Sequence, residues 1–100
     1  MNILKIINGK VELRSPTGSL IRTIVSSGAS AADLNDDGEF VMVTYENGKV
    51  ELRKESGSLI KTIPCNKALN AKFNGDDIVI SLENGKTELR KQSGSLIRTI

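Results

Sequence analysis

The sequence has no histidine and no tryptophan, a single cysteine, and only three aromatic residues, Phe40, Tyr45 and Phe73. Without histidine the chain cannot hold a Ser-His-Asp set, and no zinc-ligand spacing is present. Cys65 cannot form an intrachain disulfide, and it has no histidine base to activate it as a nucleophile. We therefore interpret Cys65 as a small apolar filler, and we expect no enzymatic activity, no catalytic residue, no cofactor and no bound metal.

The sequence also lacks an excess of one charge and any long apolar run. It contains 14 Lys and Arg against 12 Asp and Glu, with a formal net charge of +2, and the two signs alternate along the chain. This pattern contains no basic stripe of the kind that binds nucleic acid. The apolar stretches are far shorter than the roughly 20 residues of a membrane helix, and residues 1–7 are too short for a secretory signal. We expect no nucleic-acid or membrane partner, and the lone thiol favours a cytoplasmic location.

What the sequence does contain is one phrase that occurs three times. Residues 8–24, 47–63 and 84–100 read NGKVELRSPTGSLIRTI, NGKVELRKESGSLIKTI and NGKTELRKQSGSLIRTI. The spacing between the copies is 39 and then 37 residues. A period of about 40 residues indicates a repeat architecture.

The repeated phrase predicts a β-hairpin. Each copy opens with Asn-Gly, the strongest short signal for a type I′ turn, in which both central residues need a positive φ. A run of period two follows, in which Val50 and Leu52 face one way while Lys49, Glu51 and Arg53 face the other. A second turn containing glycine and a second strand, such as residues 58–63, complete the phrase.

Further strands precede each Asn-Gly pair. They lie at residues 2–6, 40–45 and 78–82, and the middle one is almost continuously apolar, as in a strand buried on both faces. In the second and third copies a polar turn comes before this strand, and residues 29–34 or 67–73 come before the turn. The alanines of the first of these segments suit a crowded inner strand. The full repeat is thus four antiparallel strands in about 40 residues, which is the unit of a β-propeller blade.

The order of these elements resembles the blade of WD-repeat propellers. The residues that carry the resemblance are Leu34 to Gly38, Phe40 to Tyr45, Glu46 to Gly48, Val50 to Leu52, Ser56-Gly57 and Leu59 to Ile63. The third copy fits with an inner turn that is shorter by two residues. The resemblance implies an all-β fold and a rigid disc that presents surfaces to protein or peptide partners. The chain departs from the family at the Trp-Asp position, which holds Arg14-Ser15, Arg53-Lys54 or Arg90-Lys91, and it has no Gly-His pair.

Counting strands gives a partial propeller of nearly three blades. Residues 1–100 form one repeat domain, with an incomplete blade at 1–24, a second blade at 25–63 and a third at 64–100, about 11 strands in all. Propellers close with 4–8 blades, so we expect the chain to be a piece of a ring, or its copies to assemble head to tail, most simply as a dimer with six blades. The edges predicted to meet in such an assembly are Ile3, Leu4, Ile6, Leu96, Ile97 and Ile100.

Two motifs invite a functional reading. Asp33 to Gly38 has the D-x-N-x-D-G start of a calcium loop, but the twelfth position, Thr44, holds no carboxylate, so we interpret the segment as an ordinary polar turn. The Lys-x-Glu-x-Arg face recurs at residues 10–14, 49–53 and 86–90. It could form an anion site, but we favour a ladder of ion pairs between neighbouring blades near the outer rim.

The function that these observations favour is a non-catalytic binding or scaffold module that self-assembles into a closed ring. One alternative is a carbohydrate-binding propeller of lectin type. The chain has only three aromatic residues, and Tyr45 does not recur, since Ile6 and Leu82 occupy the equivalent positions in the other copies. Both observations argue against a lectin. The other alternative is a propeller fragment with no ligand of its own.

Overall fold

The computed structural model describes residues 1–65 and 67–100, and in them the chain forms eleven β-strands. The count agrees with the sequence prediction. The strands are β1 (Ile3–Ile7), β2 (Lys10–Arg14), β3 (Leu20–Val25), β4 (Ala29–Leu34), β5 (Phe40–Tyr45), β6 (Val50–Lys54), β7 (Leu59–Ile63), β8 (Ala68–Asn74), β9 (Asp77–Leu82), β10 (Thr87–Lys91) and β11 (Leu96–Thr99).

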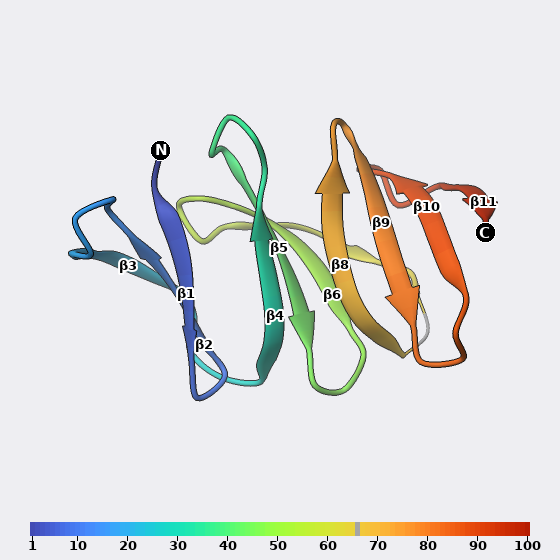
Figure 1. Ribbon diagram of the computed structural model, residues 1–100, viewed down its shortest axis with the longest axis horizontal. Coiled ribbons are helices and arrows are strands. Elements are labelled where there is room, and N and C mark those ends of the chain that lie inside the picture. The colour runs from blue at the N-terminus through green and yellow to red at the C-terminus, as the bar shows by residue number, and fades with distance from the viewer. Residues whose placement is uncertain (66) are drawn as a thin grey trace.

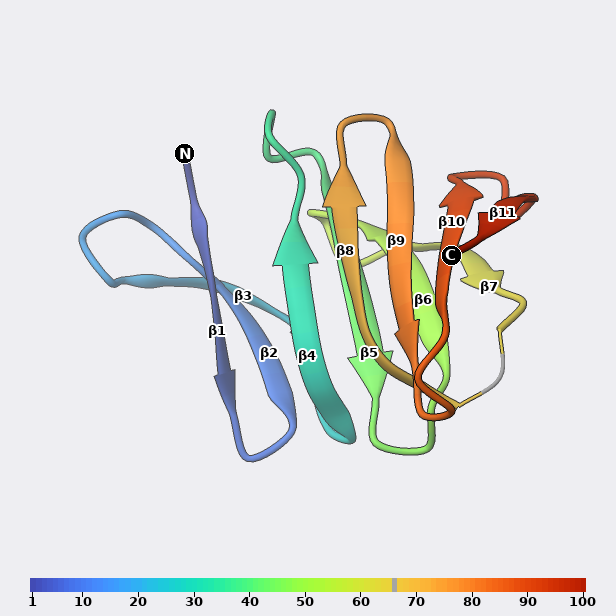
Figure 2. The same cartoon turned by 45° about the vertical axis from the view of Figure 1, so that its right-hand side comes forward.

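These strands form three antiparallel sheets, each a meander of strands consecutive in sequence (Figure 1). The first sheet has the order β1-β2-β3, the second β4-β5-β6-β7 and the third β8-β9-β10-β11. In Figure 2 the innermost strands β1, β4 and β8 appear from left to right in chain order. The predicted repeat of four strands is therefore present in the second and third sheets, and the first sheet has three.

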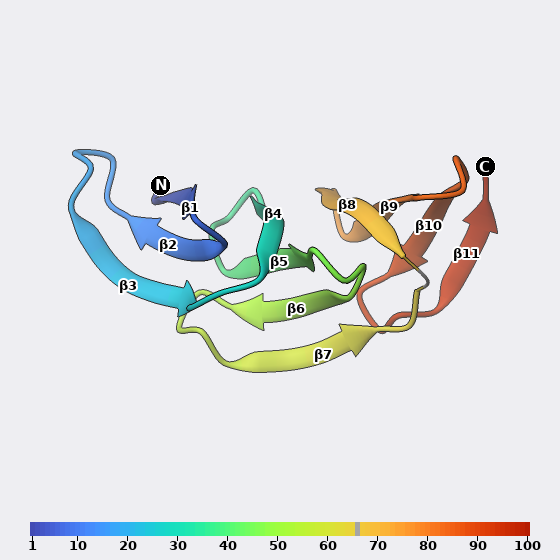
Figure 3. The same cartoon turned by 90° about the horizontal axis from the view of Figure 1, so that it is seen from below.

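The sheets follow one another along an arc. Seen from below, β1, β4 and β8 lie on its inner side, and β3, β7 and β11 lie on its outer side (Figure 3). Each sheet thus runs radially from an inner strand to an outer strand. This is the arrangement expected of successive propeller blades.

The Asn-Gly turns differ between copies, which corrects the prediction that all three are type I′ turns. In the first sheet Asn8 and Gly9 both have a positive φ, 51° and 78°, and Ile7 pairs directly with Lys10. Of the Asn47-Gly48 pair in the second sheet, only Gly48 has a positive φ. The loop is one residue longer, since Gly48 N donates to Tyr45 O and Tyr45 N donates to Lys49 O. This is a three-residue loop with a glycine bulge, and the third sheet repeats it at Gly85.

The extra loop residue changes which positions are equivalent. Because Ile7 pairs with Lys10 as Tyr45 pairs with Lys49, the residue equivalent to Tyr45 in the first sheet is Ile7 and not Ile6. Ile6 pairs with Val11 and so corresponds to Thr44, which pairs with Val50. A one-residue shift in a strand moves every side chain to the other face, so this correction decides which residues face the next sheet.

The core consists of two layers, one between each pair of neighbouring sheets. We call the face that a sheet turns toward the following sheet its forward face, and the opposite face its backward face. The forward face of the first sheet and the backward face of the second form one cluster, whose buried members are Val11, Leu13, Ile24, Val25, Ala29, Val41 and Val43. The second and third sheets form the other: Met42, Val50, Leu52, Ile63, Ala68, Ala71, Ile78, Ile80 and Leu82. Burial of apolar surface between sheets therefore joins the repeats.

Backbone contacts tie each sheet to the next at its Asn-Gly loop. Ala29 N donates to Gly9 O, and Ala68 N donates to Gly48 O, both at 3.0 Å. The approach is so close that a Cβ on Gly48 would lie 2.5 Å from Lys67 Cα. Glycine is required at such positions because no side chain fits. The inner strand of each following sheet thus begins on the loop of the preceding sheet.

Candidate assembly faces and the repeated Glu-Arg network

The forward face of the third sheet has no following sheet among the residues that the structure describes. Residues that pair directly across strands point to the same side, so this face carries Val79 with Leu89 and Ser81 with Thr87. All four side chains are partly exposed. The equivalent residues of the second sheet, Met42, Leu52, Thr44 and Val50, are fully buried by the third sheet.

The end of the outer strand shows the same contrast most clearly. Ile24, Ile63 and Ile100 close the three copies of the repeated phrase. Ile24 is 6% exposed and Ile63 is 2% exposed, whereas Ile100 is 75% exposed. Burying an isoleucine side chain is worth about 1.5–3 kcal/mol, so the third sheet leaves unused a contact that the first two sheets make.

The backward face of the first sheet is the other free face. It carries Ile3, Lys5 and Ile7, which pair with Arg14, Glu12 and Lys10. In the second and third sheets the corresponding strands supply Val41 and Val43, and Ile78 and Ile80, all of them fully buried. Lys5 therefore stands where the other copies have a buried Val43 or Ile80.

The predicted assembly residues divide into three groups. Leu4 is partly buried and packs against the cluster between the first two sheets, and Ile6 shares its face, so neither lies on a terminal face. Leu96 and Ile97 lie on β11 and are exposed, but so are their equivalents Leu20, Ile21, Leu59 and Ile60 in the other sheets. Their exposure is a property of every outer strand. Ile3 and Ile100 are the predicted residues that the structure places on the two free faces.

Sequence reasoning missed several residues of these faces, namely Lys5, Ile7, Val79, Ser81, Thr87 and Leu89. The signal that could have found them is the alternation within each strand. Val50 and Leu52 were already assigned to one face, and reading the same positions in the third copy gives Thr87 and Leu89.

The Lys-x-Glu-x-Arg motif forms a network inside each sheet, which corrects the prediction of ion pairs between blades. Arg14, Arg53 and Arg90 each donate from Nε to the glutamate two residues earlier, at 2.9, 3.0 and 2.9 Å. Each arginine also donates from Nη1 to a glycine carbonyl in the following turn, at 2.6, 2.7 and 2.6 Å. Each arginine therefore ties its own strand, β2, β6 or β10, to the turn that follows.

Glu51 is the most fully bonded of these carboxylates. It is 4% exposed, accepts a hydrogen bond from Tyr45 Oη at 2.5 Å, and lies 3.2 Å from Lys49 Nζ. Burial alone would raise the pKa of Glu51, but the hydrogen bonds from Tyr45, Arg53 and Lys49 outweigh it and hold that pKa below its usual value. Burial, followed by the neighbouring Glu51 carboxylate, raises the pKa of Tyr45. The Tyr45 hydroxyl is thus committed to the fold.

The calcium-like segment is a structural turn. Asn35 Oδ1 accepts from the backbone N–H groups of Glu39 and Phe40, both at 2.9 Å, and Asn35 Nδ2 donates to Asp37 Oδ1. Asp33 Oδ2 accepts from Phe73 N at 2.8 Å, a bond from the second sheet to the third. Among the described residues no three His, Cys, Asp or Glu side chains gather in a way that could hold a metal ion.

Cys65 lies partly buried against the cluster between the second and third sheets, as predicted for a filler. Its burial raises the pKa of the thiol. The thiolate is the reactive form, so this environment disfavours nucleophilic chemistry.

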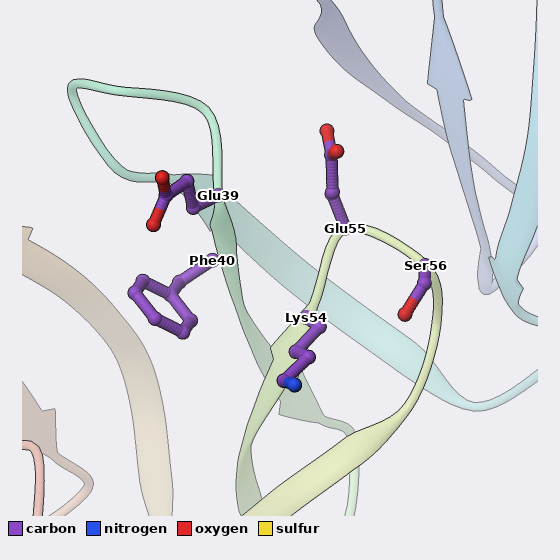
Figure 4. A pocket seen from close by; sticks show the side chains of 5 residues that line it. All are labelled: Glu39, Phe40, Lys54, Glu55 and Ser56. Carbon is purple, nitrogen blue, oxygen red and sulfur yellow. The ribbon is translucent and has the colours of Figure 1, made fainter.

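A shallow hollow lies at one end of the second sheet, lined by Glu39, Phe40, Lys54, Glu55 and Ser56 (Figure 4). Its two loops are tied together where Glu55 N donates to Glu39 O. The charged ends of Glu39, Lys54 and Glu55 point in different directions and do not converge on one point. This hollow offers no arrangement for acid-base chemistry. Along the described chain no helix is long and apolar enough to cross a membrane.

Comparison with known proteins identifies the fold. No protein-family model and no curated protein matches the sequence. Among solved structures, BamB from Moraxella catarrhalis matches with a TM-score of 0.74 and 12% identity over 99% of this chain and 32% of that chain. Hydrazine synthase from Kuenenia stuttgartiensis matches with a TM-score of 0.73 and 16% identity over 90% of this chain and 29% of that one.

The chain spans about a third of the length of these structures. It is a partial β-propeller: all-β, with eleven strands in three antiparallel sheets that resemble successive blades. The predicted fold class is confirmed.

Proposed function

We propose that this chain is a non-catalytic binding and scaffold module whose copies assemble head to tail into a closed ring. The observation that supports this proposal is the equivalence of the free faces with the buried ones. The forward face of the third sheet carries Leu89 where the second sheet carries Leu52, and Leu52 packs in one cluster with Ile78 and Ile80. The backward face of a second copy would present Ile3 and Lys5 at those two positions.

The arc supports the proposal of two copies. Three sheets fan along part of a circle (Figure 3), and propellers close with 4–8 blades. Two copies would give six sheets. A head-to-tail contact of this kind is heterologous, and it forms a closed ring if the rotation closes.

Lys5 sets the strength that we expect of this contact. It stands on the innermost strand of the first sheet, where the other copies bury Val43 and Ile80. A lysine can lay its stem along an apolar face and keep its ammonium group in water, here toward the centre of the ring. Together with Ser81 and Thr87 it makes the interface more polar than the two cores within the chain. The assembly should therefore be reversible, and Lys5→Ile should strengthen it, seen as dimer persisting at lower protein concentration.

The argument for a binding role begins with the charged residues, which bond to one another within each sheet. Glu12, Glu51 and Glu88 are each bonded to an arginine of their own strand, so the recurrent charges serve the framework. The surfaces that remain are the two flat sides of the disc, formed by the turns. The resemblance to WD-repeat blades favours protein or peptide partners for these sides. This preference rests on analogy of fold.

The test is the native mass in solution, by light scattering after gel filtration, of wild type and three variants. Wild type should give a dimer of the 10.8 kDa chain. Leu89→Asp damages the forward face and Ile3→Asp the backward face, so each variant alone should be a monomer. Ile60→Asp places the same charge on an exposed outer-strand residue and should leave the dimer intact.

Mixing the two monomeric variants decides the geometry. In the mixture the intact forward face of Ile3→Asp can meet the intact backward face of Leu89→Asp, so one good interface returns and a heterodimer should form. A symmetric dimer in which the same patch meets itself would give no such rescue. A wild-type monomer at high concentration would overturn the ring.

A further inference from the structure

Among residues 1–65 and 67–100, β1 has no strand paired along its inner edge. In the second and third sheets the equivalent strands, β5 and β9, each pair with an inner strand, β4 or β8. In the first sheet β1 pairs with β2, and no other strand of the described chain pairs with it. An open strand edge is a template for pairing with a further strand.

The register shows which backbone groups this edge offers. The two-residue turn pairs Ile7 with Lys10, so the N–H and C=O groups of Ile3, Lys5 and Ile7 point toward β2. Those of Leu4 and Ile6 point toward the open edge. Their equivalents in the second sheet, Met42 and Thr44, pair with Asp33 and Ala31 of β4.

The chain itself contains two examples of the strand that fits such an edge. β4 and β8 share the pattern Ala-x-x-Ala-x-(Leu or Phe), at Ala29, Ala32 and Leu34, and at Ala68, Ala71 and Phe73. Both show the same register shift after the first alanine. All of these side chains pack in the inter-sheet clusters, where Ala68 and Ala71 are buried. Small residues at the alanine positions let the inner strand approach the preceding sheet.

The forward face of the third sheet has the features that contact an inner strand elsewhere in the chain. Each inner strand begins where its first alanine donates to the loop glycine of the preceding sheet, Gly9 or Gly48. In the third sheet the equivalent Gly85 has open space around it. A hollow also lies on β8 and β9, which correspond to β4 and β5, the strands that β8 contacts in the second sheet. It is lined by Asn70, Lys72, Phe73, Asn74, Val79 and Ser81.

From this placement we infer a binding site for an extended peptide strand of the pattern Ala-x-x-Ala-x-(Leu or Phe), which pairs antiparallel with the open edge of β1 as a fourth strand. In the head-to-tail ring, the β8–β9 hollow and Gly85 of the neighbouring copy form the second wall of the same slot. That second wall rests on the proposed function, whereas the pairing with β1 does not.

The test uses a capped synthetic copy of residues 67–75 as the probe and the full chain as the receptor. Amide hydrogen exchange by NMR should slow at least tenfold at Leu4 and Ile6 when the peptide saturates. Lys5 is the internal control, because its N–H already points to β2 and should be unaffected. A matched peptide with leucine at both alanine positions should bind at least tenfold more weakly by fluorescence anisotropy.

The same titration on Leu89→Asp separates this inference from the ring. If both hold, the peptide should bind wild type more tightly than the variant, which loses the second wall. Slowed exchange at Leu4 and Ile6 in a protein that stays monomeric would support the strand site while overturning the ring. Unchanged exchange at both amides in a wild-type dimer would overturn the strand site while leaving the ring.

Discussion

Leu52 and Leu89 occupy the same position in successive sheets, and the proposed ring predicts different effects for their substitution. Leu52 is fully buried beneath the third sheet, and Leu89 is partly exposed on the free forward face. Leu52→Ala should cost about 2–5 kcal/mol of unfolding free energy, because it removes buried methyl groups and leaves a cavity. In a single chain Leu89→Ala should cost about 1 kcal/mol, roughly half the value for complete burial of a leucine.

Thermal unfolding followed by circular dichroism, over a hundredfold range of protein concentration, distinguishes Leu52→Ala from Leu89→Ala. At a shift of about 4–8 °C per kcal/mol for a domain of this size, Leu89→Ala should lower Tm by about 4–8 °C in dilute protein and Leu52→Ala by at least twice as much. Assembly stabilises the folded chain by mass action, so the Tm of wild type should rise with concentration. Leu89→Ala should flatten that rise and Leu52→Ala should not. Equal losses for both variants in dilute protein would refute the assignment of Leu89 to a free face.

Three further predictions concern the contacts within the chain. Asp33→Ala removes the acceptor for Phe73 N and should cost about 1–3 kcal/mol in urea unfolding, whereas Asp33→Asn, which keeps an oxygen there, should cost less; equal losses would contradict the bond. Because the folded pKa of Glu51 lies below its usual 4.5, its stabilisation is present above pH 4.5 and is lost as pH falls through the folded pKa. The stability difference between wild type and Glu51→Gln should therefore shrink in acid, and a constant difference down to about pH 3 would count against this reading. Gly48→Ala should destabilise more than Gly57→Ala in the same assay, since both have a positive φ but only Gly48 would clash with Lys67; similar losses would mean that the close approach is unimportant.

The strands and their grouping into sheets could be read from the sequence because the signals are local. Alternation in the run from Lys49 to Arg53 and a glycine in every turn recur three times, so each copy supports the others. The face that each residue presents was harder to predict. The identical Asn-Gly pairs close a two-residue loop at Asn8 and a three-residue loop at Asn47, and that difference depends on how many residues the flanking strands pair.

The partners of the charged residues also could not be predicted from local sequence patterns. The prediction of ion pairs between blades followed from spacing along the surface, but the arginine side chain is long enough to reach both the glutamate beside it and the next turn. Glu51 receives Tyr45 as well, which no spacing rule indicates. The exposure of Leu96 likewise could be predicted. Whether that exposure marks an assembly face could not, because Leu20 and Leu59 are equally exposed in the other sheets.

The Glu-Arg network affects how easily such a chain can gain or lose a repeat. Each sheet neutralises its own glutamate with its own arginine, and the arginine is fixed to a glycine carbonyl of the same sheet. A copy can therefore be inserted, removed or exchanged without leaving a buried charge unpaired in its neighbour. Duplication of one such unit yields, at once, a second unit whose glutamate and arginine are already paired, so that the apolar faces and the backbone contacts at the sheet boundary are what has to fit.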